Sequence, residues 1–163
     1  MAPSYLPIGT WVRIEKPELQ AIVDRLRELG YRVVAPTLGD GAVVYGEITS
    51  VVELPIGYVD VQDGGHYRLV KTGEPRYFDY VVGPHSLKNY LFPSHSTVVE
   101  GIRADGTWQV RVPEPPSEPW AVIGPRSCDL HALKVQDRVF LEDKFVDPAY
   151  AARRERLFVA AVN

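Results

Sequence analysis

The sequence has a single cysteine, Cys128, and only four histidines among its 163 residues. One thiol excludes an internal disulfide, and no two cysteines or histidines stand at the spacing of a metal-binding motif. These residues therefore cannot complete a metal centre by themselves. An excess of positive charge is also missing, because 18 Lys and Arg against 21 Asp and Glu leave a net charge of −3. We therefore expect no nucleic-acid partner, since phosphate recognition needs a clustered basic surface.

Long apolar segments are absent as well. The N-terminus lacks a basic region followed by an apolar stretch, and the longest apolar runs fall far short of the ~20 residues that span a bilayer. We therefore expect a cytoplasmic protein without a membrane partner. What the chain does contain is 45% hydrophobic residues, nine Tyr, five Phe and three Trp. This composition is typical of one ordinary domain that buries its own core.

Glycine and proline punctuate the first two-thirds of the chain. Apolar residues at helical spacing between Pro17 and Gly30 predict a first helix over residues 16–30. Next come three pairs of β-branched and aromatic runs, each pair divided by an Asp-Gly or Gly-Asp-Gly turn, which predict a meander of antiparallel hairpins. The paired runs are 31–38 with 42–54, 58–61 with 66–70, and 98–103 with 107–112.

The chain changes character after Pro113–Pro119, a proline-rich stretch that predicts an extended connector. Beyond it, apolar strands at 120–124 and 157–162 flank two helical patterns, at 128–143 and 147–157. A strand, a helical crossover and a strand predict a parallel pair.

We therefore predict an α/β fold. Its mixed sheet carries antiparallel hairpins in the first two-thirds and a parallel strand-helix-helix-strand unit at the C-terminus. We expect a single domain over 1–163, made of a helix and hairpin region (1–112), the connector (113–119) and the βααβ unit (120–163).

The turn after the first predicted parallel strand is the leading candidate site. Ligands gather at the carboxyl ends of parallel strands, so Arg126, Cys128 and Asp129 form a candidate cofactor-binding turn, with Cys128 as candidate metal ligand. A helix N-terminus favours the thiolate, although Asp129 opposes that effect. The alternative is that Cys128 is a small buried hydrophobic residue. A cysteine protease is not indicated, because His131 stands only three residues downstream on the same predicted helix.

A second candidate site is the segment around His85 and Lys88. Both side chains could meet an anion at the start of a short helix over 87–91, which Ser86 is expected to cap. The alternative is that this helix is a lid on the core and Lys88 is simply solvated. We favour the lid, because the segment lacks the glycine-rich loop that lets a phosphate approach the backbone.

The two predicted parallel strands should end at the same edge of the sheet. In that arrangement Asn163 lies near Cys128. A natural domain seldom ends on the last residue of a buried parallel strand, where the strand would fray. We therefore expect the chain to be part of a longer protein.

Three segments, FDYVVGPHSLKNYLFP, GPRSCDLHALKVQDRVFLED and DPAYAARRERLFVAAVN, carry a family resemblance by their order and spacing. They resemble the N-terminal half of the beta-subunit family of nickel–iron sulfhydrogenases and of the related anaerobic sulfite reductase A subunits. The upstream GDGAVVYGEITSVVELPIGYVD fits the same family, so the resemblance covers nearly the whole chain. It implies a cytoplasmic electron-transfer subunit that binds [4Fe–4S] clusters and passes electrons between a catalytic partner and a donor subunit. In such relatives a cysteine-rich segment and a ferredoxin-like two-cluster part follow the last strand, and this sequence contains neither.

Together these observations predict the N-terminal domain of an iron–sulfur electron-transfer subunit in a hydrogenase or sulfite-reductase type complex. Cys128 would supply one cluster ligand, with the others following Asn163, so this chain alone is expected to bind no cluster. The absence of a catalytic triad or carboxylate pair favours a non-catalytic part of such a complex. The alternatives are a ligand-free interaction module with Cys128 as packing, and a flavin or nucleotide binder, which would need a glycine pattern that is missing after residue 124.

Overall fold

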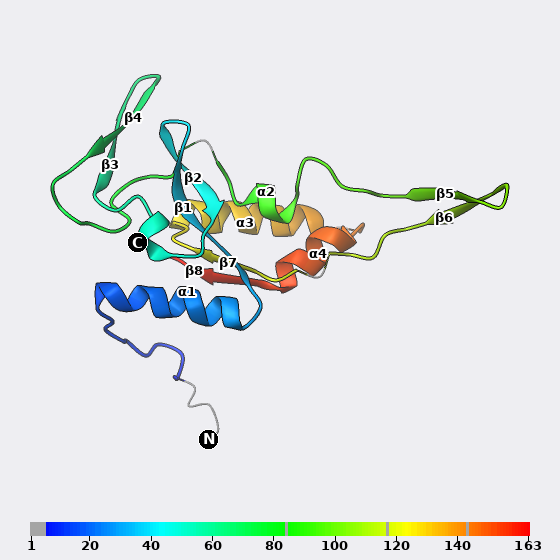
Figure 1. Cartoon of the computed structure of the whole chain (residues 1–163), viewed down its shortest axis with the longest axis horizontal. Coiled ribbons are helices and arrows are strands. Elements are labelled where there is room, and N and C mark those ends of the chain that lie inside the picture. Colours follow the sequence, from blue (N-terminus) through cyan, green and yellow to red (C-terminus); the bar gives the residue numbers. More distant parts are fainter. Residues whose placement is uncertain (1–5, 84, 117, 143) are drawn as a thin grey trace.

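A four-stranded mixed sheet of order β2-β1-β7-β8 organises the protein (Figure 1). The computed structural model describes residues 6–83, 85–116, 118–142 and 144–163. The strands are β1 (Arg32–Gly39), β2 (Ala42–Glu47), β7 (Trp120–Ile123) and β8 (Leu157–Ala160). β1 pairs antiparallel with β2 and parallel with β7, and β7 pairs parallel with β8. The predicted fold class and the predicted parallel pair are confirmed, and the β1–β7 pairing, which joins the two halves of the chain, goes beyond the prediction.

Alternate residues of the two central strands face opposite sides of the sheet, and each side has its own helical cover. Val33, Ala35, Ala121 and Ile123 pack against α1 (Leu19–Glu28). The predicted first helix is thus confirmed; a 3-10 turn, η1 (Lys16–Glu18), precedes it, and Gly30 with φ +87° follows it. A left-handed residue after the last turn is a common helix ending.

The opposite side of the sheet carries the other three helices (Figure 1). These are α2 (Lys88–Leu91), α3 (Ser127–Phe140) and α4 (Pro148–Glu155). They enclose a second core around Val34 and Val122, to which Leu133 and Tyr150 contribute. α4 begins as the sequence predicts, because Asp147 Oδ1 accepts a hydrogen bond from Tyr150 N at 2.7 Å and Pro148 occupies the first turn.

The other predicted hairpins form as well, but they do not join the main sheet. β3 (Tyr58–Asp63) pairs with β4 (His66–Lys71), and β5 (Glu100–Ala104) pairs with β6 (Thr107–Arg111). Each pair is a separate two-stranded sheet, so the expectation of one continuous meander is wrong. The β3–β4 hairpin stays close to the sheet, whereas β5–β6 projects away from the rest of the protein (Figure 1).

One predicted strand ends early for a local reason. The run 42–54 continues after β2 as a 3-10 turn, η2 (Val51–Glu53). Ser50 Oγ accepts a hydrogen bond from Val52 N, and the Glu53 carboxylate accepts one from Ser50 N at 2.8 Å. This reciprocal capping satisfies backbone groups that a strand would otherwise pair with a neighbour.

The predicted connector has neither helix nor strand in its described residues, 113–116 and 118–119. Ser117 within it, Asp143 at the end of the predicted helix 128–143, and Pro84 beside His85 lie outside the described residues, as do residues 1–5. Among the described residues, none of the helices has the length and apolar character needed to cross a membrane.

Candidate functional site

The turn from β7 into α3 lies at the carboxyl edge of the parallel strands. Gly124, with φ +89°, reverses the chain direction there, and its N–H donates a hydrogen bond to Ala160 O at 2.9 Å. One step further on, Val162 N donates to Pro125 O at 3.0 Å. The predicted shared edge is therefore confirmed: the end of β8 runs alongside the turn that leads to Cys128.

The Asp129 side chain holds the first turn of α3 in place through two hydrogen bonds. Its Oδ2 accepts a hydrogen bond from Arg126 N at 3.0 Å and another from the Tyr45 hydroxyl at 3.0 Å. Tyr45 is only 4% exposed. Burial first, and then the neighbouring Asp129 charge, raise the pKa of Tyr45 far above its ordinary value. The phenol thus stays protonated and donates to the carboxylate, which ties the start of α3 to β2.

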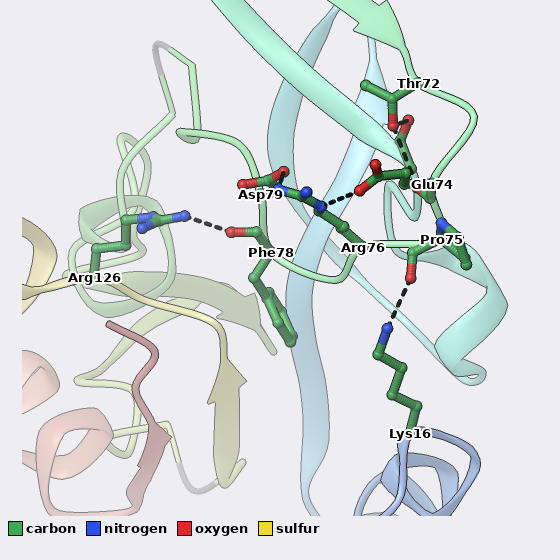
Figure 2. Close-up of polar contacts among 9 residues, drawn as sticks. Lys16, Thr72, Glu74, Pro75, Arg76, Phe78, Asp79 and Arg126 are labelled. Carbon is green, nitrogen blue, oxygen red and sulfur yellow. Dashed lines mark hydrogen bonds and ion pairs between the residues drawn. The ribbon is translucent and has the colours of Figure 1, made fainter.

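Arg126 joins the same turn to a distant part of the chain. One terminal nitrogen of its guanidinium, Nη2, donates to Phe78 O at 2.6 Å and to Tyr80 O at 2.7 Å. Figure 2 shows the bond to Phe78 at the left of the view. Both carbonyls belong to residues 72–80, which follow β4 and which we call the strap. A charged donor shared by two carbonyl groups is a strong anchor, since hydrogen bonds to ionised groups exceed neutral ones in strength.

The strap is also held at its other end. Lys16, at the start of η1, donates to Pro75 O at 3.1 Å, and Arg76 forms ion pairs with Glu74 and Asp79 within the strap (Figure 2). The strap thus connects the beginning of η1 with the beginning of α3 across the sheet edge.

Phe78 marks where the strap presses on the turn. Its backbone φ of +57° is unusual for a bulky side chain. A Cβ atom built on Gly124 would lie 2.8 Å from Phe78 Cε1 and 3.1 Å from Pro36 Cδ. Close packing of this kind leaves room only for glycine at position 124. Backbone held in a sparsely populated conformation is typical of positions that the surrounding structure over-determines.

Cys128 lies in the first turn of α3 and is exposed. The alternative that it is a buried packing residue is therefore wrong. The reason is its place around the helix: Leu133, which α3 buries in the core, is five residues further on and thus roughly 140° away around the axis. The thiol belongs to the solvent side of the same edge that Arg126 and Asp129 make rigid.

The described residues contain no cluster of three or more His, Cys, Asp or Glu that could hold a metal ion. A [4Fe–4S] cluster usually needs four thiolates. These residues therefore do not fit a complete cluster, and the exposed thiol fits one ligand position at most.

His85 and Lys88 lie on the surface, apart from this network. Both are exposed, and no hydrogen bond or ion pair within the described ranges connects them to the turn at 126–129. Ser86 Oγ accepts a hydrogen bond from Lys88 N at 3.2 Å, but α2 begins at Lys88 with Leu87 as its N-cap residue, so the prediction that Ser86 caps this helix is wrong. Leu87 and Leu91 are 3% and 1% exposed, so the segment packs on the core as the predicted lid. A part for His85 and Lys88 in cofactor binding stays a prediction.

Sequence patterns alone hardly indicate the contacts of the strap. Asp129 three residues after Arg126 is a recognisable capping pattern. The partners of the Arg126 side chain, however, are backbone carbonyls of Phe78 and Tyr80, and any residue type offers such a group. Only the positive φ at Phe78 makes this place distinctive, and residue type does not reveal it.

The chain is similar to sulfhydrogenase 2 subunit beta of Pyrococcus furiosus, with 24% identity over 153 residues. The matched stretch covers 94% of this chain and 37% of that relative, so the chain spans little more than a third of the relative's length. No family model matches the chain, and no solved structure matches it. The resemblance to a sulfhydrogenase beta subunit is confirmed as a distant similarity.

Proposed function

We propose that this chain is a domain of a subunit in a redox complex of the hydrogenase or sulfite-reductase type. Its role is to dock other parts of the complex and to present Cys128 as one ligand of a [4Fe–4S] cluster. The observation that carries the proposal is the exposure of that thiol at the carboxyl edge of the parallel strands. The distant similarity to a sulfhydrogenase beta subunit supports the class of complex.

An exposed thiol suits a shared cluster better than a private one. The remaining ligands have to come from other segments or subunits, because the described residues offer no further ligand group near by. An edge that is open to solvent lets those ligands approach.

Arg126 and Asp129 enter this proposal as positioning residues. Their bonds to the strap, to Tyr45 and to the turn itself fix the backbone that carries Cys128. A ligand held on rigid backbone keeps its geometry when a cluster changes its redox state. His85 and Lys88, on the separate surface of the lid, enter it as further candidate residues for cofactor binding.

The proposed role needs no general acid or base from this chain. Electron transfer requires a cofactor at a fixed position and a surrounding that excludes side reactions, so the domain acts as a non-catalytic part of an oxidoreductase. A cytoplasmic location belongs to the same proposal, since a single free thiol is suited to a reducing compartment.

The decisive experiment replaces the thiol in the protein expressed from its complete reading frame together with the subunits that co-purify with it. Cys128→Ser is expected to lower the iron and acid-labile sulfide content or to change the electron paramagnetic resonance spectrum of one cluster. Ser127→Ala, at the neighbouring exposed position, is the matched control and should leave both unchanged. Full cluster content and an unaltered spectrum in the Cys128→Ser protein would reject the ligand role and leave the interaction module as the better description.

A simpler measurement checks the exposure on which the proposal depends. In the folded chain, Cys128 should react with a maleimide at a rate within about tenfold of that in the urea-unfolded chain, because accessibility and thiolate character govern the reaction. Labelling that occurs only after unfolding would remove the observation that carries the proposal.

A further inference from the structure

The β5–β6 hairpin and its flanks, residues 98–112, form an arm that projects from the rest of the protein (Figure 1). Every residue of β6 is exposed. A single two-stranded hairpin is marginally stable in water on its own. The arm therefore has the features of an element that another surface covers.

The register of the arm separates two faces. On one face Glu100 and Arg111 stand opposite each other and form an ion pair, followed by Ile102 opposite Gln109. The other face carries Gly101 opposite Val110 and Arg103 opposite Trp108. A Cβ on Gly101 would lie 3.4 Å from the Trp108 ring, so the indole covers the bare glycine backbone.

The second face is apolar except for Arg103. Trp108, Val110 and Val112 follow one another at alternate positions and are 66%, 72% and 73% exposed, and Val99 beside them is 55% exposed. We call this row of side chains the stripe. Contiguous exposed apolar surface is typical of interaction sites.

At the base of the arm the stripe runs into a groove of about 380 Å³. Val112 belongs to both, so the two surfaces are continuous. Prolines make up much of the groove wall, and Glu114, Asp147 and Arg153 add two acidic groups and one basic group. The proline residues are Pro113, Pro115, Pro116 and Pro148. Rigid apolar rings and a guanidinium form a suitable bed for an indole.

The charges on this surface are complementary to one another. Arg103 lies near the tip, directly opposite Trp108, and Glu114 lies in the groove at the base. Both side chains are exposed, and neither has a hydrogen bond or ion pair to another described residue. Trp108 and Glu114 are six residues apart, roughly 20 Å of extended chain. The midpoint between them is position 111, and Val110 and Val112 lie on either side of it.

We propose that the arm docks against the arm of a second copy of this chain, antiparallel and around a two-fold axis near residue 111. In this arrangement Trp108 of one copy enters the proline groove of the other, Val110 lies over Val112, and Arg103 reaches Glu114. Each contact occurs twice, as an isologous interface requires. One surface thus supplies the indole, the groove, the cation and the carboxylate at matching distances.

This inference is independent of the cluster proposal, because the arm lies away from the edge that carries Cys128 (Figure 1). The interface is small, so we expect a reversible dimer with a dissociation constant on the order of 1–100 μM. Sedimentation velocity of the chain over a concentration series measures it directly.

Trp108→Ala should raise the dissociation constant at least tenfold, since a buried tryptophan is a typical interface hot spot. Trp11→Ala is the matched control: Trp11 is 99% exposed but lies before α1, and its loss should leave association unchanged. Because the Trp108 side chain is exposed, circular dichroism and the melting temperature of a dilute sample should be the same in both variants and the unsubstituted chain.

A charge exchange tests the orientation. Arg103→Glu should weaken the dimer through repulsion from Glu114, and adding Glu114→Arg should restore it. A chain that stays monomeric over the whole concentration range would overturn the proposal and leave the stripe to a different protein. A dimer that survives Trp108→Ala and Arg103→Glu unchanged would overturn it too, by showing that the copies meet elsewhere.

Discussion

Two hairpins in this protein share the same turn and differ in almost everything else. Asp40 and Gly41 between β1 and β2 have φ angles of +50° and +74°, and Asp105 and Gly106 between β5 and β6 have +50° and +79°. Yet Val33, Val34 and Ala35 of β1 are at most 1% exposed, whereas all of β6 is exposed. The turn determines where the chain reverses, and the partners of the strands determine whether the hairpin is buried.

The partner that makes the difference is β7. It pairs parallel with β1 and so makes β1 an interior strand of a sheet with helices on both sides, with β2 as an edge strand. The arm has no such neighbour within the described residues, and its apolar side chains remain in water. The comparison therefore predicts that identical substitutions have large effects in the sheet and small ones in the arm.

The largest contrast is expected for valine to aspartate. Val122, 1% exposed in β7, would place an unpaired carboxylate in the core, so Val122→Asp should cost about 4 kcal/mol or more and leave the chain largely unfolded. Val110, 72% exposed in β6, should change the free energy of unfolding by less than about 0.5 kcal/mol when replaced in the same way. Urea unfolding followed by circular dichroism measures both. A comparable loss in Val110→Asp at low protein concentration would mean that the arm is part of the cooperative core.

The next contrast concerns two glycines with the same backbone conformation. Gly124→Ala combines a strained φ of +89° with contacts at 2.8 and 3.1 Å to Phe78 and Pro36, and should cost about 3 kcal/mol. Gly106→Ala, with φ +79° and nothing within 4 Å, should cost only about 1 kcal/mol. The same urea titrations give both values. Equal losses would indicate that Phe78 yields easily and that the strap does not press on the turn.

The two hairpins and the sheet also show which parts of the fold the sequence can predict and which it cannot. Local chemistry identifies α1, all three hairpin turns, the cap at Asp147, and the parallel pair of β7 and β8, because each signal lies within a few residues. The pairing of β1 with β7 and the separation of the hairpins depend on contacts between distant segments. The residue pattern of one strand does not indicate which distant strand it pairs with.

The candidate site divides in the same way. The position of Cys128 at the sheet edge follows from the order strand, turn, helix, and the sequence predicts it. Whether the thiol faces solvent depends on which side of α3 packs against the core. The sequence alone is compatible with a buried and with an exposed Cys128. The strap was out of reach, because Arg126 binds main-chain oxygens 46 and 48 residues away.

A third contrast compares two arginines. Arg126→Gln removes a charged donor from the carbonyls of Phe78 and Tyr80 and should cost about 2 kcal/mol. Arg111→Gln breaks only the exposed ion pair with Glu100 in the arm and should cost a few tenths of a kcal/mol, about 0.3. Beyond stability, Arg126→Gln should speed amide hydrogen exchange across residues 76–81, and Arg111→Gln should not. Unchanged exchange there in Arg126→Gln would show that Lys16 and the Phe78 contact hold the strap without it.

The smallest predicted changes in the free energy of unfolding distinguish two tyrosines outside the arm. The Tyr150 hydroxyl donates to Asp137 Oδ1 at 2.8 Å, so Tyr150→Phe should cost about 1 kcal/mol at neutral pH. The buried Tyr80 hydroxyl has no partner among the described residues, so Tyr80→Phe should be neutral or stabilising by up to about 1 kcal/mol. Differential unfolding in urea resolves the opposite signs. A loss in Tyr80→Phe as large as that in Tyr150→Phe would mean that the hydroxyl has a partner, such as a buried water.

The dependence of stability on pH above 10 gives a further test of these two tyrosines. Burial is the main cause that raises the pKa of Tyr80 and of Tyr150 above the ordinary value of 10.0. A raised pKa in the folded state means that the stability from each neutral phenol is fully present below pH 10 and is lost as the pH rises beyond it, because the unfolded chain ionises first. Each phenylalanine variant should therefore lose stability less steeply above pH 10 than the unsubstituted chain. The arm contains no tyrosine. The difference in alkaline slope between each variant and the unsubstituted chain therefore reports the phenol that was replaced. An unchanged slope in Tyr80→Phe would place its phenol in contact with water, and that side of the core would then be as open as the arm.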